Sequence, residues 1–150
     1  MTAVDEAGTA LSVRNTSQVI NDTVKQFRAQ VPECIASGLV DMSTGMLLAA
    51  DTLDEHPGEV LDLIAAATFD LFQGRNVTMI EEIFKARYGV LDDRHYFQEF
   101  LAQSDSYVHV FLRSTNQDIV GVVVARKTAN TGMILTQARL VMKQLDAGLS

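Results

Sequence analysis

The chain has 150 residues, of which 47% are hydrophobic and 21% charged, and its formal net charge is −7. A chain of this length and apolar content is expected to fold as one domain around its own core. Its single cysteine, Cys34, excludes an intramolecular disulfide and a thiolate metal cluster within one chain.

The negative charge is concentrated in the first half of the chain. Residues 29–74 contain eight acidic residues and no Lys or Arg. Such a segment repels nucleic-acid phosphates and anionic membranes, which argues against both partners, while a basic protein surface suits it. The N-terminus lacks the basic residues of a secretory signal, and no segment approaches the ~20 apolar residues of a membrane span. We therefore expect a cytoplasmic protein that neither binds nucleic acid nor inserts into a membrane.

The first helix is expected to begin after a flexible N-terminus. Residues 1–14 are small, polar and unpatterned, which is typical of a flexible segment. Asn15 then offers an N-cap, with Gln18 three residues later, and Pro32 marks the end of the helix. Spacings of four, three and four place one apolar face along it, made of Ile20, Val24, Phe27 and Val31.

A hairpin and a second helix follow. Two apolar runs flank Ser43-Thr44-Gly45, which predicts a β-hairpin whose glycine takes a positive φ angle. The pattern predicts a helix over about 57–73, with Pro57 in its first turn. This helix is apolar on nearly all sides. Because one sheet cannot cover so wide an apolar arc, we expect it to contact a partner molecule or a second covering element.

The rest of the chain predicts a short helix, three strands and a last helix. The short helix is expected over about 78–88, with Thr78 and Glu81 as a capping box. Strands are expected over 96–103, 107–114 and 118–126, and the last of these is apolar throughout, as in a central strand. Asn130 is expected to cap a final helix that ends near Leu145.

These elements predict an α+β fold, an α/β sandwich in which a five-stranded antiparallel sheet is flanked by helices. The order is α-β-β-α-(α)-β-β-β-α. A single domain is expected over residues 15–150, with an extra helical segment at about 75–95.

The sequence offers no convincing catalytic or ligand-binding motif. The stretch ARKTANTGMILTQARL resembles a phosphate-binding junction of strand and helix, but it lacks the glycine and lysine pattern of a phosphate loop. His56, His95 and His109 are too widely spaced to suggest a metal site. The loop DDRH, residues 92–95, is interpreted as solvated, and Cys34 as a small apolar core residue. We expect no catalytic residue, cofactor or metal.

Two stretches of the chain carry a family resemblance, VPECIASGLVDMSTGMLLAAD and YVHVFLRSTNQDIVGVVVARKTANTGMILTQARL. They resemble the Roadblock/dynein light chain family, which is close to the longin and profilin-like folds. The resemblance covers residues 17–146. The segment from Gly74 to His95 is longer than the usual link between the second helix and the third strand of the family.

The resemblance implies a non-enzymatic homodimer that pairs its second helix and third strand with their copies. It also implies a role beside a small Ras-like GTPase. In the third strand, YFQEFLAQ, no Lys or Pro guards the sheet edge. By position, the residues expected at the dimer or partner interface are Leu61, Ile64, Ala65, Thr68, Phe69 and Phe72 on the helix, and Phe97, Phe100 and Leu101 on the strand.

Three functional hypotheses follow. The leading hypothesis is a dimeric scaffold or regulator that binds a small GTPase, or an adaptor without a GTPase. The second is a small-ligand sensor whose pocket is lined by Phe84, Tyr88, Tyr96 and Phe97. The third is an enzyme that uses the DDRH loop or Cys34.

Overall fold

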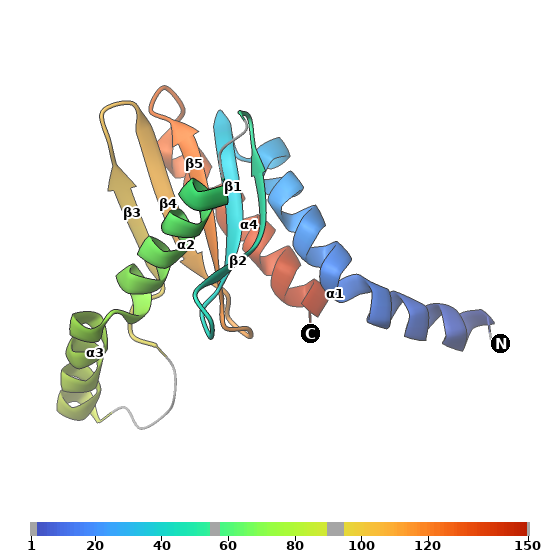
Figure 1. The fold of residues 1–150 in the computed structure, drawn as a ribbon, viewed down its shortest axis with the longest axis horizontal. Coiled ribbons are helices and arrows are strands. Elements are labelled where there is room, and N and C mark those ends of the chain that lie inside the picture. Colours follow the sequence, from blue (N-terminus) through green and yellow to red (C-terminus); the bar gives the residue numbers. More distant parts are fainter. Residues whose placement is uncertain (1–2, 55–57, 90–94, 150) are drawn as a thin grey trace.

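The protein is an antiparallel sheet with helices on both faces, as Figure 1 shows. The computed structural model describes residues 3–54, 58–89 and 95–149. The strands are β1 (Cys34–Asp41), β2 (Met46–Thr52), β3 (Glu99–Gln103), β4 (Tyr107–Arg113) and β5 (Ile119–Arg126), in the spatial order β2-β1-β5-β4-β3. All neighbouring strands are antiparallel, and β5 lies at the centre. The predicted fold class and the predicted order of elements are confirmed.

The first and last helices cover one face of the sheet. They are α1 (Ala3–Gln30) and α4 (Thr131–Leu149), and they pack against each other as well (Figure 1). Between them and the sheet lies the larger core cluster, which includes Phe27, Leu39 and Leu145, all fully buried. The Ser37 hydroxyl donates a hydrogen bond of 2.6 Å to the Val24 carbonyl and so fastens α1 to β1.

The first helix begins much earlier than expected. The sequence placed its N-cap at Asn15, but α1 is helical from Ala3, so Asn15 lies inside the helix. The segment expected to be flexible over 1–14 is therefore helical from Ala3 onward. No proline interrupts residues 3–30, and Ala, Leu and Glu in this stretch favour a helix. The cap-like residue Asn15 did not outweigh that preference.

The hairpin between β1 and β2 forms where the sequence placed it. Gly45 has a φ of 76°, the left-handed conformation that a residue without Cβ adopts without strain. The Asp41 carboxylate accepts hydrogen bonds from the backbone amide and the hydroxyl of Ser43, at 2.9 and 2.7 Å. The hydrogen bond from the Ser43 hydroxyl above all, and that from the Ser43 amide, lower the pKa of Asp41. The turn is thus held by its own residues.

The second helix, α2 (Gly58–Gln73), crosses the opposite face of the sheet (Figure 1). It covers a smaller core cluster that includes Val40, Val120 and Phe72. Pro57, expected in its first turn, lies outside the described residues. Within the described residues, no helix is long and apolar enough to cross a membrane.

The extra helix, α3 (Arg75–Tyr88), continues from the end of α2 and stands beyond the end of the sheet (Figure 1). It begins at Arg75 after Gly74, so the capping box expected from Thr78 and Glu81 is wrong. The Thr78 hydroxyl instead donates to the carbonyls of Gly74 and Arg75, inside the first turn. Glu81 is buried.

Candidate functional site

The inner side of α2 packs on the chain's own sheet. Ala65, Thr68 and Phe72 are buried there, with Thr68 donating its hydroxyl to the Ile64 carbonyl at 2.8 Å. These three residues were expected at or near the interface, and in the single chain their helical phase turns them toward the sheet. Leu61 and Phe69 are half-buried at the margin of α2.

The outer side of α2 is exposed and apolar. Leu63 is 70% exposed, and Ile64, Ala66 and Ala67 are exposed beside it. Of these, only Ile64 was assigned to the interface from the sequence. The sequence did not single out Leu63, because a helix with apolar residues all round gives no phase from which to choose its outer side.

A groove of about 350 Å³ runs between α2 and the part of the sheet that α2 leaves uncovered. Leu61 and Ile64 line it from α2, and Val122, Val124 and His109 line it from β5 and β4. Burial lowers the pKa of His109 below its usual value, which favours the neutral imidazole. An apolar groove beside an exposed apolar helix face forms a single continuous surface.

The third strand forms one edge of this sheet. Phe100 pairs with Phe111 and packs on Phe72, with ring centroids 4.8 Å apart, so it faces α2. Leu101 pairs with Val110, which belongs to the core under α1 and α4, so Leu101 lies on the opposite face and is exposed. Phe97 precedes the strand, which begins at Glu99 rather than at the expected position 96.

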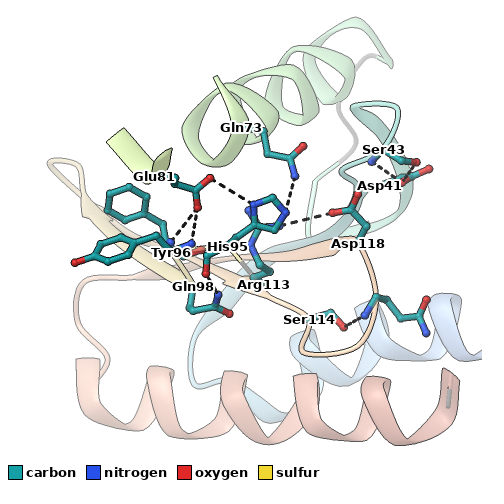
Figure 2. A network of polar contacts seen from close by, with 12 residues as sticks. Asp41, Ser43, Gln73, Glu81, His95, Tyr96, Gln98, Arg113, Ser114 and Asp118 are labelled. Atoms are coloured by element: carbon teal, nitrogen blue, oxygen red, sulfur yellow. Dashed lines mark hydrogen bonds and ion pairs between the residues drawn. The ribbon is translucent and has the colours of Figure 1, made fainter. Parts of the chain in front are cut away.

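A polar network ties α2 and α3 to the segment before β3, as Figure 2 shows. The Glu81 carboxylate accepts hydrogen bonds from the backbone amides of Tyr96, at 2.6 Å, and Phe97, at 3.4 Å. His95 lies between Glu81 and Gln73, with each ring nitrogen 3.4 Å from one of them. A His95 ring that carries its proton on Nδ1 would satisfy both contacts, accepting from the Gln73 amide at Nε2 and donating to Glu81 at Nδ1.

Arg113 lies beside this network with few partners (Figure 2). Its side chain is 5% exposed, and its Nε donates to the Phe97 carbonyl at 3.3 Å. Its Nη1 is 3.7 Å from Asp118 Oδ1, and the guanidinium lies 5.1 Å from the ring centre of Phe72. Burial lowers the pKa of this arginine. Nothing in the sequence marked Arg113, because its burial comes from segments distant along the chain.

Two further sequence candidates, Asn130 and Cys34, have structural roles. The Asn130 side chain accepts a hydrogen bond of 3.0 Å from the Met133 amide, so Asn130 caps α4 as expected. Cys34 is buried, and that burial raises the pKa of its thiol to about 11, which makes it a poor nucleophile. Asp92, Asp93 and Arg94 lie outside the described residues, as does His56. Within the described residues, no three His, Cys, Asp or Glu side chains form a metal-binding group.

Comparison with known proteins identifies the fold. No protein-family model and no curated protein sequence matches the chain. Among solved structures, it is similar to MglB in a tetrameric arrangement, with 16% identity, a TM-score of 0.62, and 85% of each chain covered. It is also similar to the gliding protein MglB of Thermus thermophilus, with 17% identity, a TM-score of 0.62, and 85% of this chain and 86% of that chain covered.

A third similar structure is a Roadblock/LC7 domain from Streptomyces avermitilis. It is 16% identical, its TM-score is 0.63, and the match covers 86% of this chain and 96% of that chain. Such a structural match over most of both chains at low identity is evidence about the fold. The chain therefore has the fold of the Roadblock/LC7 domain.

Proposed function

We propose that this protein is a non-catalytic homodimeric scaffold that binds a small Ras-like GTPase in the cytoplasm. The observation that carries the dimer is the continuous apolar surface formed by the outer side of α2 and the groove beside it. An exposed Leu63 next to Ile64 is costly in water, since each buried leucine or isoleucine side chain contributes about 1.5–3 kcal/mol. A second copy of α2, placed alongside the first, covers both.

The free edge of β3 supports the same arrangement. The Arg113 amide donates to the Gln98 carbonyl, and the Ser104 amide donates to the Tyr107 carbonyl. Because hydrogen bonding alternates along an antiparallel strand, the amides of the odd-numbered residues 99, 101 and 103 point away from β4. No Lys or Pro lies within β3 to block pairing. Two copies of β3 therefore fit together as neighbours in one continuous sheet.

The oligomeric state tests the dimer. Analytical ultracentrifugation of the wild type at micromolar concentration is expected to give twice the mass of the chain. Leu63→Asp is expected to give the monomer, because it places a charge in the apolar contact without disturbing the core. Leu140→Asp is the matched control, since Leu140 is an exposed leucine on α4, across the sheet from α2. A wild type that sediments as a monomer contradicts the proposal.

The GTPase is the partner that the resemblance to the Roadblock family implies. The acidic character of residues 29–74 suits a basic partner surface, and Asp62 and Asp70 are exposed on α2. A wild-type bait in native lysate, run with GDP and with a non-hydrolysable GTP analogue, is expected to enrich a small GTPase in one nucleotide state. Leu63→Asp serves as the second bait. A partner that ignores the nucleotide supports an adaptor without a GTPase instead.

A further inference from the structure

A second cleft, of about 900 Å³, lies away from the α2 surface. It is bounded by α3, by the segment that precedes β3, and by the turn between β4 and β5 over residues 114–118. Phe84 and Tyr88 line it from α3, and Tyr96 lines it from the segment before β3. Three of the four aromatic residues that the ligand-sensor hypothesis named therefore line this cleft. Phe97 is absent from the lining and packs edge-on against Tyr96, at 5.2 Å and 84°.

One wall of the cleft is a set of nearly parallel aromatic rings. The ring of Phe84 stacks on Tyr96, with centroids 4.8 Å apart and planes 7° apart. It also stacks on Tyr88, at 6.1 Å and 8°. Tyr88 is 66% exposed and Tyr96 is 48% exposed, so each keeps ring surface open to solvent. Such a wall offers offset stacking to another flat ring.

The cleft also contains a buried cation that lacks a full set of partners. Arg113 lines it, and the buried Nη2 of this side chain has no hydrogen-bond acceptor among the described residues. A buried donor without an acceptor is destabilising, and the cost is larger for a charged group. The neighbouring Asp118 is too far for a hydrogen bond, at 3.7 Å, and its side chain is 48% exposed, so it can turn into solvent.

The charge of the cleft differs from that of the whole chain. Among the described residues that line it, Lys85 and Arg113 are basic and Asp118 is acidic, whereas the chain carries a net charge of −7. Gln98 lines the cleft as well, and its amide group donates to the His95 carbonyl at 2.6 Å (Figure 2). A cationic, aromatic recess on an acidic protein favours an anion that carries a flat ring.

We propose that this cleft binds a small planar aromatic molecule bearing a carboxylate or phosphate group. The ring of the ligand stacks along Tyr88 and Tyr96, and its anionic group accepts hydrogen bonds from the Arg113 guanidinium. The residues that line the cleft belong neither to α2 nor to β3, the two elements of the proposed dimer surface. A bound ligand contacts the three segments that line the cleft, which are α3, the segment before β3 and the β4–β5 turn.

Three small molecules test whether the ring or the anionic group of the ligand is recognised. Each is titrated into ¹⁵N-labelled protein, and binding is followed by the chemical shifts of the backbone amides. Indole-3-carboxylate has the ring and a carboxylate, phenyl phosphate has a ring and a phosphate, and indole-3-carboxamide has the ring without the charge. We expect saturable shifts at Phe84, Tyr88, Tyr96 and residues 113–118. At least one anionic probe is expected to bind about tenfold more tightly than the carboxamide, as for a charge-assisted hydrogen bond.

Variants of the chain test the assignment of the two contacts. Arg113→Met is expected to abolish the preference for the anionic probes, and Tyr88→Ala is expected to weaken all three, because the ring wall is shortened. Tyr88 is well exposed, so its variant leaves the fold intact even if Arg113→Met does not fold. Arg139→Met is the control, since Arg139 pairs with Glu99 outside the cleft, at 2.8 Å.

Two results overturn the proposal. One is the absence of saturable shifts around the cleft with both anionic probes up to about 10 mM, where even a weak site responds. The other is that neither anionic probe binds more tightly than the neutral indole-3-carboxamide. Neither result bears on the proposed dimer. The dimer is tested separately with Leu63→Asp, and Leu63 does not line the cleft.

Discussion

Glu81 of α3 accepts a hydrogen bond of 2.6 Å from the backbone amide of Tyr96, fifteen residues further along the chain. This carboxylate is buried and also receives the Phe97 amide and the His95 ring. The Glu81 carboxylate thus accepts the backbone hydrogen bonds that a neighbouring strand would otherwise accept from the segment before β3. It fixes where α3 lies relative to the edge of the sheet, and it holds one wall of the aromatic cleft.

Replacing Glu81 is expected to loosen this attachment. Glu81→Ala leaves the Tyr96 amide without its acceptor, and the loss is expected to be about 1–3 kcal/mol in the free energy of unfolding. Urea denaturation measures it. Glu82→Ala is the matched control, because Glu82 is the neighbouring acid and is exposed. Equal stability of the two variants would mean that the Glu81 contacts contribute nothing.

Gly121 in the central strand is expected to resist enlargement. A Cβ there would lie 2.7 Å from Met142 Sδ and 3.1 Å from Phe27 Cζ, both in the core under α1 and α4. Gly121→Ala is therefore expected to cost about 1–3 kcal/mol by overpacking. Gly38→Ala is the control, since its nearest neighbours would lie at 3.4 Å, an ordinary contact. Thermal or urea unfolding of both variants ranks them, and a Gly38→Ala loss equal to that of Gly121→Ala contradicts the account.

Cys34 is expected to react slowly in the folded protein. Burial raises the pKa of its thiol to about 11, so at about pH 8 the thiolate that reacts with disulfide reagents is scarce. Ellman's reagent followed by absorbance is expected to label the unfolded chain quickly and the native chain far more slowly. Rapid labelling of the native protein would instead reveal an accessible thiolate and revive the hypothesis of a nucleophilic Cys34.

His109 is expected to make stability depend on pH. Its folded pKa lies below the unfolded value near 6.5, so as pH falls the unfolded state binds its proton first. The contribution of His109 to the free energy of unfolding is complete above about pH 6.5. It is lost as the pH falls through that value toward the pKa of His109 in the folded protein. Urea titrations near pH 7.5 and 5.5, about one unit on either side, are expected to show a smaller loss for His109→Gln than for the wild type. An identical loss in both proteins removes His109 as the cause.

The sequence by itself determined the elements whose cause is local. The turn at Gly45 needs a positive φ and an Asp41 carboxylate two residues before Ser43, and all three are neighbours in the chain. The cap of α4 needs only Asn130 and the next turn. The unbroken apolar run of β5 indicated a strand covered on both faces, and β5 lies at the centre of the sheet. The spacing of apolar residues and the identity of the turn and cap residues were sufficient to predict these elements.

Only the tertiary structure decided which residues face outward and which polar groups meet. The phase of α2 is set by the sheet beneath it, so Ala65, Thr68 and Phe72 turn inward while Leu63 faces solvent. The early start of α3 frees Glu81 from any capping role and lets it receive the Tyr96 amide. Arg113 becomes a buried cation because Phe72, Phe97 and Asp118 surround it, from three separate segments. Such contacts arise from chain closure over long separations, which no local pattern encodes.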